Sequence, residues 1–166
     1  MERKTVYIET TIPSYITGKP SRDVLTASRQ NTSRYFWENE RHNFELFTSQ
    51  YTEDECLKGN KEAAKRRLDF VKKIPYLIET AEVVNLAEIY FDLLNIPKKA
   101  RTDSFHIAIC VVHKVDYLLS WNFTHIGHDS EIKLHYYNDK NGLFTPRLVT
   151  ADNLLHIIEE ERYGLA

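Results

Sequence analysis

Residues 102–122 read TDSFHIAICVVHKVDYLLSWN, and this stretch decides the fold class. Its first part, from Asp103 to about Lys114, is apolar most of the way round a helix, which indicates a central helix with Thr102 as its N-cap. Its second part, Asp116–Ser120, has the composition of a short buried strand. A helix followed at once by a strand is typical of α/β domains.

The same alternation extends through the rest of the chain. Further strands are predicted at residues 5–8, 44–49, 76–78 and 147–150, and further helices at 22–41, 52–59, 61–73, 81–94, 130–137 and 151–162. Ser21 and Thr52 are the expected N-caps of the first two of these helices. The alternation predicts a mostly parallel sheet, and the absence of a linker or repeat predicts one domain over residues 1–166.

Composition restricts the class of protein. The 166 residues include 22 basic and 24 acidic side chains, which gives a net charge of −2. Nucleic-acid-binding domains usually have a basic surplus, which this chain lacks. A local basic patch is still compatible with this net charge. Cys56 and Cys110 lie far apart in the sequence, so we expect buried free thiols in a reducing compartment. No signal peptide or membrane-spanning run is visible, so a soluble cytoplasmic protein is expected.

Polar residues gather where the predicted strands end. They are Glu9, Thr10 and Thr11 after the first strand, Glu53, Asp54 and Glu55 after the second, Asp103 at the start of the central helix, and Ser120 and Asn122 after the fourth strand. Ligands of open parallel sheets bind beyond these carboxyl ends. Clustered carboxylates repel each other unless a cation shares the site, and hard divalent cations prefer oxygen ligands. The pattern therefore predicts a divalent-metal site, which in hydrolases can serve phosphodiester cleavage.

Each of these residues alone has a simpler interpretation. Glu9 could end its strand at the surface, and Asn122 could be a turn residue. Asp103 and the acids of residues 53–55 could be ordinary first-turn acids that match the helix dipole. Together, however, all of them occupy the same kind of position in one alternating chain, and this shared placement predicts the metal site.

Three other groups of residues allow alternative interpretations. His106 and His113 lie two helical turns apart without any accompanying zinc motif, so a packed helix histidine with one hydrogen bond is favoured for His106. The basic residues of 61–73 are interpreted as a solvated helix face, with a surface for the RNA backbone as the alternative. The aromatic residues 35–37 are expected in the core or in a dimer contact.

Four stretches resemble the PIN-domain family: VYIETTIPSY (6–15), TSQYTEDECLKGN (48–60), RTDSFHIAICVVHKVDYLLSWNFTHI (101–126) and PRLVTADNLL (146–155). The chain is more narrowly similar to the single-domain branch that includes the toxin ribonucleases of bacterial and archaeal toxin–antitoxin pairs, the VapC type. The resemblance implies a three-layer α/β/α domain and ribonuclease activity that depends on Mg²⁺ or Mn²⁺.

The resemblance also assigns roles to individual residues. The acidic quartet of the family corresponds to Glu9, Glu55, Asp103 and Asn122, with Glu53 as the alternative register for Glu55. The three acids would hold the metal, and Asn122 would position a water or a second ion. Thr10 is expected to bond a ligating carboxylate or a phosphate, and His125 to contact the RNA backbone.

Two departures from the family pattern leave two functional hypotheses open. The first position is usually aspartate and here is Glu9, and the fourth is the neutral Asn122, so the quartet carries −3 instead of −4. The first hypothesis is a metal-dependent ribonuclease, a toxin with an antitoxin partner, acting as a homodimer. The alternative is a PIN-like RNA-binding or partner-binding module with weak or no catalysis.

Overall fold

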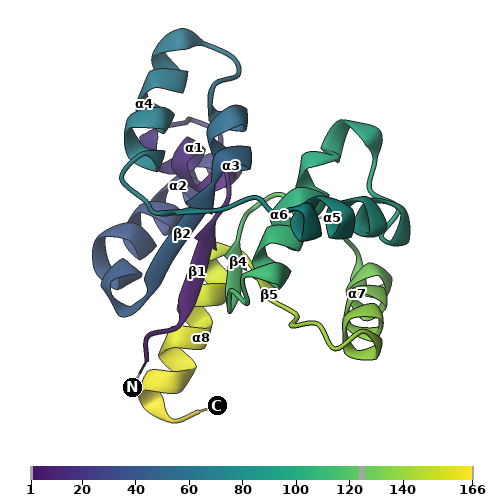
Figure 1. Cartoon of the computed structure of the whole chain (residues 1–166). Helices are drawn as coiled ribbons and strands as arrows, with labels where there is room; N and C mark the ends of the chain where they lie inside the picture. The colour runs from purple at the N-terminus through teal and green to yellow at the C-terminus, as the bar shows by residue number, and fades with distance from the viewer. Residues whose placement is uncertain (1, 124–125, 166) are drawn as a thin grey trace.

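The computed structural model describes residues 2–123 and 126–165 and contains a central sheet of five parallel strands (Figure 1). The strands are β1 (Thr5–Ile8), β2 (Glu45–Ser49), β3 (Tyr76–Leu77), β4 (Tyr117–Leu119) and β5 (Arg147–Val149), and their order is β3-β2-β1-β4-β5. The predicted parallel α/β fold is confirmed, with β1 at the centre of the sheet.

Helices cover both faces of this sheet, which gives three layers (Figure 1). They are α1 (Thr11–Thr17), α2 (Val24–Tyr35), α3 (Gln50–Cys56), α4 (Lys61–Val71), α5 (Ala81–Leu93), α6 (Thr102–Val112), α7 (His128–Lys140) and α8 (Ala151–Tyr163). Successive side chains of a strand point to opposite faces. Tyr7 accordingly joins the core beneath α5, α6 and α7, whereas Val6 and Ile8 join the core that contains residues of α8.

The strand order creates a switch point between β1 and β4. From β1 the chain moves outward through β2 to β3, and it then crosses the sheet through α5 and α6 to reach β4 on the other side of β1. Ile8 pairs with Leu119, so these two strands end side by side. Open α/β sheets bind ligands in the crevice at such a point.

α6 is the central helix that its apolar sequence predicts, because eight of its eleven residues are buried. Its predicted start is wrong in one respect: Thr102 is not an N-cap, and no side chain caps the helix. The reason is the short 3₁₀ turn Lys98–Ala100, which runs directly into α6. The Arg101 carbonyl accepts hydrogen bonds from the Ser104 amide and hydroxyl, so the backbone satisfies this end.

Two other predicted N-caps are also wrong. α3 begins directly after β2 with Ser49 as its N-cap, while Thr52 is buried and donates its hydroxyl to the Ile8 carbonyl. The cap of α2 is Asp23, which accepts from the Thr26 amide, and Ser21 instead accepts from the Asp23 amide. In both cases a neighbouring residue with the same capping chemistry occupies the position.

The helix predicted over 22–41 ends sooner than expected. α2 stops at Tyr35 and the chain continues as a π-helical turn, Phe36–Glu40, and a 3₁₀ turn, Arg41–Asn43. Phe36 is fully buried, as predicted for the core, whereas the neighbouring Tyr35 is exposed. A π turn holds one more residue than an α turn, which changes the faces on which the residues after Tyr35 lie.

Three further expectations concern the surface and the thiols. Cys56 and Cys110 are buried free thiols, as predicted.

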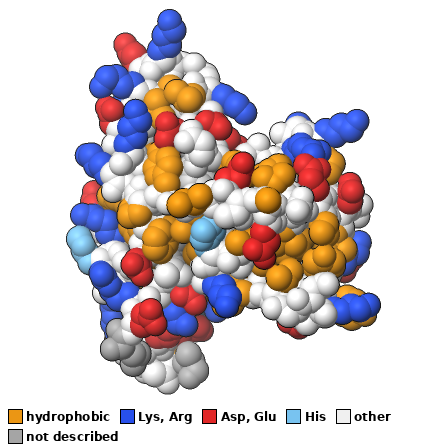
Figure 2. All heavy atoms as spheres, viewed as in Figure 1, with side chains coloured by type: hydrophobic (Ala, Val, Ile, Leu, Met, Phe, Trp, Pro, Cys, Tyr) orange, Lys and Arg blue, Asp and Glu red, His pale blue; other side chains and the backbone are white. Residues whose placement is uncertain are grey.

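On α4, Lys65 pairs with Asp69 at 3.0 Å and Arg67 donates to the carbonyls of residues 56 and 58, which favours the interpretation of the basic residues of 61–73 as a solvated helix face. Figure 2 shows blue and red side chains interspersed around α4 on the viewed face. No helix of the described residues is long and apolar enough to cross a membrane.

Candidate metal centre

Glu9 follows β1 and lies inside the protein with 1% of its surface exposed. Three donors converge on its Oε2: the Thr11 amide at 2.9 Å, the Thr11 hydroxyl at 2.6 Å and the Ser120 hydroxyl at 2.7 Å. The interpretation of Glu9 as a surface strand end is therefore wrong. A buried carboxylate with this many dedicated donors is held in a fixed position at the switch point.

Glu55 reaches the same place from α3. Its Oε1 accepts from the Thr10 hydroxyl at 2.8 Å and contacts His106 Nε2 at 2.6 Å. This is the role predicted for Thr10, a hydrogen bond to a candidate ligating carboxylate. Glu53 points elsewhere and accepts a hydrogen bond from the Tyr76 hydroxyl, so of the two registers Glu55 is the one at this site.

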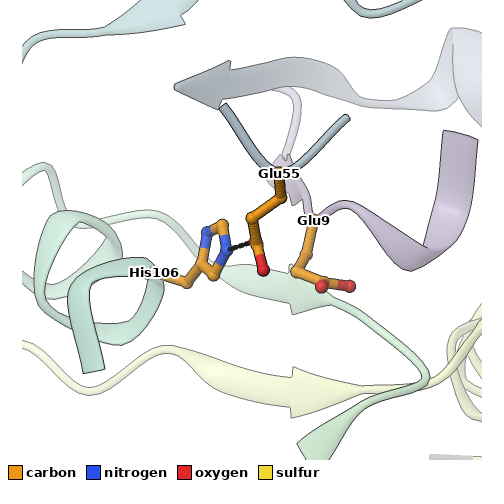
Figure 3. Close-up of side chains that lie close together, drawn as sticks. All are labelled: Glu9, Glu55 and His106. Atoms are coloured by element: carbon orange, nitrogen blue, oxygen red, sulfur yellow. Dashed lines mark hydrogen bonds and ion pairs between the residues drawn. The ribbon is translucent and has the colours of Figure 1, made fainter. Parts of the chain in front are cut away.

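His106 is completely buried, and its ring lies beside the Glu55 carboxylate (Figure 3). Its Nε2 contacts Glu55 and its Nδ1 contacts the Tyr7 hydroxyl at 2.7 Å, so it has two partners and not the one expected. The Tyr7 hydroxyl also lies 2.5 Å from the Ser49 hydroxyl. Glu9, Glu55 and His106 each offer a ligand atom within 4.8 Å of the others, and this group could hold a metal ion.

Asp103 and Asn122 complete the predicted quartet around this group. Asp103 opens α6, is 2% exposed and is hydrogen-bonded to the Asn122 side chain. The backbone N–H of Asn122 donates to the Ser120 hydroxyl, and the Ser120 hydroxyl donates to Glu9. Hydrogen bonds thus connect Glu9, Asn122 and Asp103 through Ser120, while Glu55 joins the group through the proximity of its carboxylate to Glu9 and His106.

The charges in this centre perturb one another. Burial, followed by the negative charges of Glu9 and Glu55, raises the pKa of Asp103 to about 7 against the opposing charge of His106. Burial also raises the pKa of Glu9. A carboxylic acid that gives up its proton only near neutrality is typical of crowded acidic sites.

Glu55 and His106 behave differently because they neutralise each other. Burial opposes the charged form of Glu55, but the hydrogen bond and charge of His106 outweigh it and lower the Glu55 pKa. Burial likewise opposes the charged form of His106, but Glu55 and the other acids outweigh it and raise the His106 pKa. At neutral pH we therefore expect an ionised pair.

The donor set fits a hard divalent cation. Among the described residues, the side-chain hydrogen bonds of Glu9 end on Oε2 and those of Glu55 on Oε1, which leaves Glu9 Oε1 and Glu55 Oε2 for a cation. With the Asp103 carboxylate these are oxygen ligands of the kind that Mg²⁺ and Mn²⁺ prefer. Both nitrogens of His106 are already engaged, so we assign it to Glu55 and not to the ion.

The sequence predicted the acids and the hydrogen bond of Thr10 to a candidate ligating carboxylate, but not the supporting roles of His106, Thr11 and Ser120. His106 lies one helical turn after Asp103, so the Asp-x-x-His spacing already placed both on one face of the helix. Thr11 and Ser120 were among the polar residues expected at the strand ends, but the sequence did not indicate that both would donate to Glu9. His125, the predicted RNA contact, lies outside the described residues.

No protein-family model and no curated protein sequence matches this chain. The site must therefore be interpreted from its own geometry and chemistry.

Proposed function

We propose that this protein is a metal-dependent ribonuclease in which Glu9, Glu55 and Asp103 hold Mg²⁺ or Mn²⁺. The observation that carries the proposal is the meeting of Glu9, Glu55 and His106, whose ligand atoms lie within 4.8 Å of one another, with the nearly buried Asp103 close enough to feel their charges. Three negative charges and one positive charge leave −2, which one divalent cation would neutralise. The choice of RNA as substrate follows from the PIN-domain resemblance of the sequence.

The bound ion would lower the pKa of a water molecule and stabilise negative charge on the phosphate. The protein residues position this chemistry. Thr11 and Ser120 fix Glu9, while Thr10 and His106 fix Glu55, so neither carboxylate has to reorient when RNA arrives. Preorganised polar groups of this kind avoid a reorganisation cost during reaction.

Asn122 and His106 would have separate roles. Asn122 bonds Asp103 and carries no charge, so its amide can also orient a water or a phosphate oxygen without repelling either. His106 would keep a proton on Nε2 and hold Glu55 ionised. Glu9 in place of the family aspartate adds a methylene, and its three hydrogen bonds define where the longer side chain ends.

The test is cleavage of mixed single-stranded and structured RNAs with Mn²⁺, with Mg²⁺ and with EDTA. Asp103→Asn keeps the shape of the side chain and should abolish both cleavage and Mn²⁺ binding measured by calorimetry. Asp69→Asn, at an exposed position of α4, is the matched control and should change neither. Cleavage that persists in Asp103→Asn, or in EDTA, would refute the proposal.

The same assay distinguishes the alternative of a binding module without catalysis. RNA binding without cleavage in the wild-type protein at saturating Mn²⁺ would identify that module. Asn122→Asp restores the fourth acid of the family pattern and should tighten Mn²⁺ binding if the missing charge limits affinity. Equal affinity in both proteins would contradict the charge argument.

The partners proposed from the resemblance are a homodimer and an antitoxin protein. Light scattering after size-exclusion chromatography measures the first directly. Growth arrest on expression, relieved by a small co-expressed neighbour gene product, would support the second.

A further inference from the structure

A cavity lies directly beside the candidate metal centre, beyond the carboxyl ends of β4 and β5. Its volume is about 140 Å³. Its wall includes Ser120, Trp121, Phe123, Leu148, Glu131 and Asn153. Ser120 is the shared residue, because its hydroxyl also donates to Glu9 at 2.7 Å. A molecule in the cavity would therefore adjoin the metal centre.

Trp121 is held rigidly at this wall. Its indole N–H donates to the Ser33 hydroxyl at 2.9 Å, and its backbone amide donates to the Thr11 hydroxyl at 2.9 Å. The Arg29 guanidinium lies 5.3 Å from the Trp121 ring, and Tyr15 meets the ring edge-on at 6.2 Å. Because Arg29 lies over one face of the ring, a ligand would stack on the opposite face, and the fixed ring would lose little side-chain entropy on binding.

The cavity combines apolar walls with two polar groups of defined character. Trp121, Phe123 and Leu148 supply the apolar surface. Glu131 is exposed and offers carboxylate acceptors. Asn153 Oδ1 lies 2.7 Å from the Thr150 hydroxyl, and its side-chain N–H groups make no hydrogen bond within the described part of the chain, so they are available to a ligand.

We propose that this cavity binds one unpaired base of an RNA substrate, with guanine preferred. The inference rests on the proposed function in that the substrate is RNA. Unpaired bases are typically recognised by stacking on aromatic side chains and by hydrogen bonds to their edges. Guanine presents two N–H donors beside a carbonyl acceptor, which complements a carboxylate and an amide N–H.

The size of the cavity supports a base and not a larger ligand. Sites that enclose drug-sized molecules measure roughly 300–1,000 Å³, whereas this cavity of about 140 Å³ would take a single ring system. The sugar and phosphate of the same nucleotide would stay outside it. Because Ser120 links the two sites, the base in the cavity would belong to a nucleotide next to the cleaved phosphate.

The two tryptophans of the chain allow a direct test. Trp37 packs on Phe70 with ring centroids 4.3 Å apart and does not line this cavity, so Trp37→Phe leaves Trp121 as the sole tryptophan. In this background, with EDTA present, guanosine 5′-monophosphate should quench the fluorescence saturably and more tightly than the adenosine, cytidine and uridine monophosphates.

Two variants assign the binding to the cavity. Glu131→Gln should weaken guanosine monophosphate binding about tenfold, as expected for loss of a bidentate base contact. Phe123→Leu keeps apolar bulk but removes the ring, and should weaken all four nucleotides. Glu82→Gln on α5 is the matched surface control and should bind like the parent. No saturable quenching, or equal binding by Glu131→Gln and the parent, would overturn the proposal.

This assay separates the base cavity from the proposed catalysis, because it uses neither metal nor cleavage. Guanosine-selective quenching in a protein that cleaves no RNA would support the base cavity and refute the ribonuclease. RNA cleavage by a protein whose Trp121 shows no quenching would do the opposite.

Discussion

Replacing Asp103 with asparagine should make the metal-free protein more stable at pH 8 and leave its stability unchanged near pH 4. Asp103 is almost fully buried, and burial together with Glu9 and Glu55 opposes its charged form. Asparagine has nearly the same shape and can keep a hydrogen bond to Asn122. The substitution therefore removes an unfavourable buried charge while it preserves the packing.

The magnitude follows from the pKa of the carboxyl group. In the folded protein it is about 7, against an ordinary value of 3.8. At ~1.4 kcal/mol per pKa unit the folded state loses about 4 kcal/mol above pH 7, relative to a carboxyl with an unchanged pKa. Because the folded-state pKa is the higher one, this cost is absent below pH 4, grows as the pH rises and is complete above about 7. We expect a gain of about 2–4 kcal/mol at pH 8, since asparagine does not reproduce every contact.

Urea unfolding in EDTA at pH 4 and pH 8 measures the difference between wild type and variant at each pH. Asp69→Asn provides the exposed control and should show no comparable pH dependence. Saturating Mn²⁺ should reverse the order at pH 8, because only the wild type gains the binding energy. A variant that is less stable than wild type at pH 8 without metal, or a difference independent of pH, would refute the reasoning.

Other consequences of the same site can be measured separately. His106→Gln should destabilise the protein by roughly 3 kcal/mol in urea unfolding, because it removes one partner of a buried ion pair and leaves the charge of Glu55 without compensation. Mn²⁺ affinity, followed by calorimetry, should rise about tenfold per pH unit below pH 7, since the ion displaces the proton of Asp103; a flat profile would contradict the assignment of Asp103 as a ligand. Glu55→Gln should abolish Mn²⁺ binding whereas Glu53→Gln should not, and equal losses would show that the register is wrong. Ser120→Ala should cost about 1 kcal/mol at pH 8 in thermal unfolding, because two other donors to Glu9 remain.

The fold could be predicted from the sequence because its signals are local. The apolar helix of residues 102–112 and the short strands around it follow from composition and spacing alone. Capping residues were harder, since Ser49 and Asp23 compete with Thr52 and Ser21 for the same role within two or three positions. The order of the strands depends on contacts far apart in the chain, so no local pattern could supply it.

The candidate site also has a part that the sequence could predict and a part that it could not. The acids stand at strand ends and helix starts, which are visible in the sequence, and parallel topology brings those ends together. The hydrogen bond that Ser120 donates to Glu9 joins residues that are 111 positions apart in the sequence. Such partners become apparent only when β1 and β4 are known to be neighbours.

The Tyr7 and Ser49 hydroxyls beside His106 bear on how a metal ion could bind and dissociate at this site. The Tyr7 hydroxyl lies between His106 Nδ1 and the Ser49 hydroxyl, and either end of each contact can act as donor. Rotating these hydroxyls lets the histidine ring carry one proton or two while its neighbours keep every bond. We therefore expect the metal-bound and metal-free forms of the protein to have the same backbone conformation. A cation would then bind and dissociate without a change of fold at the site.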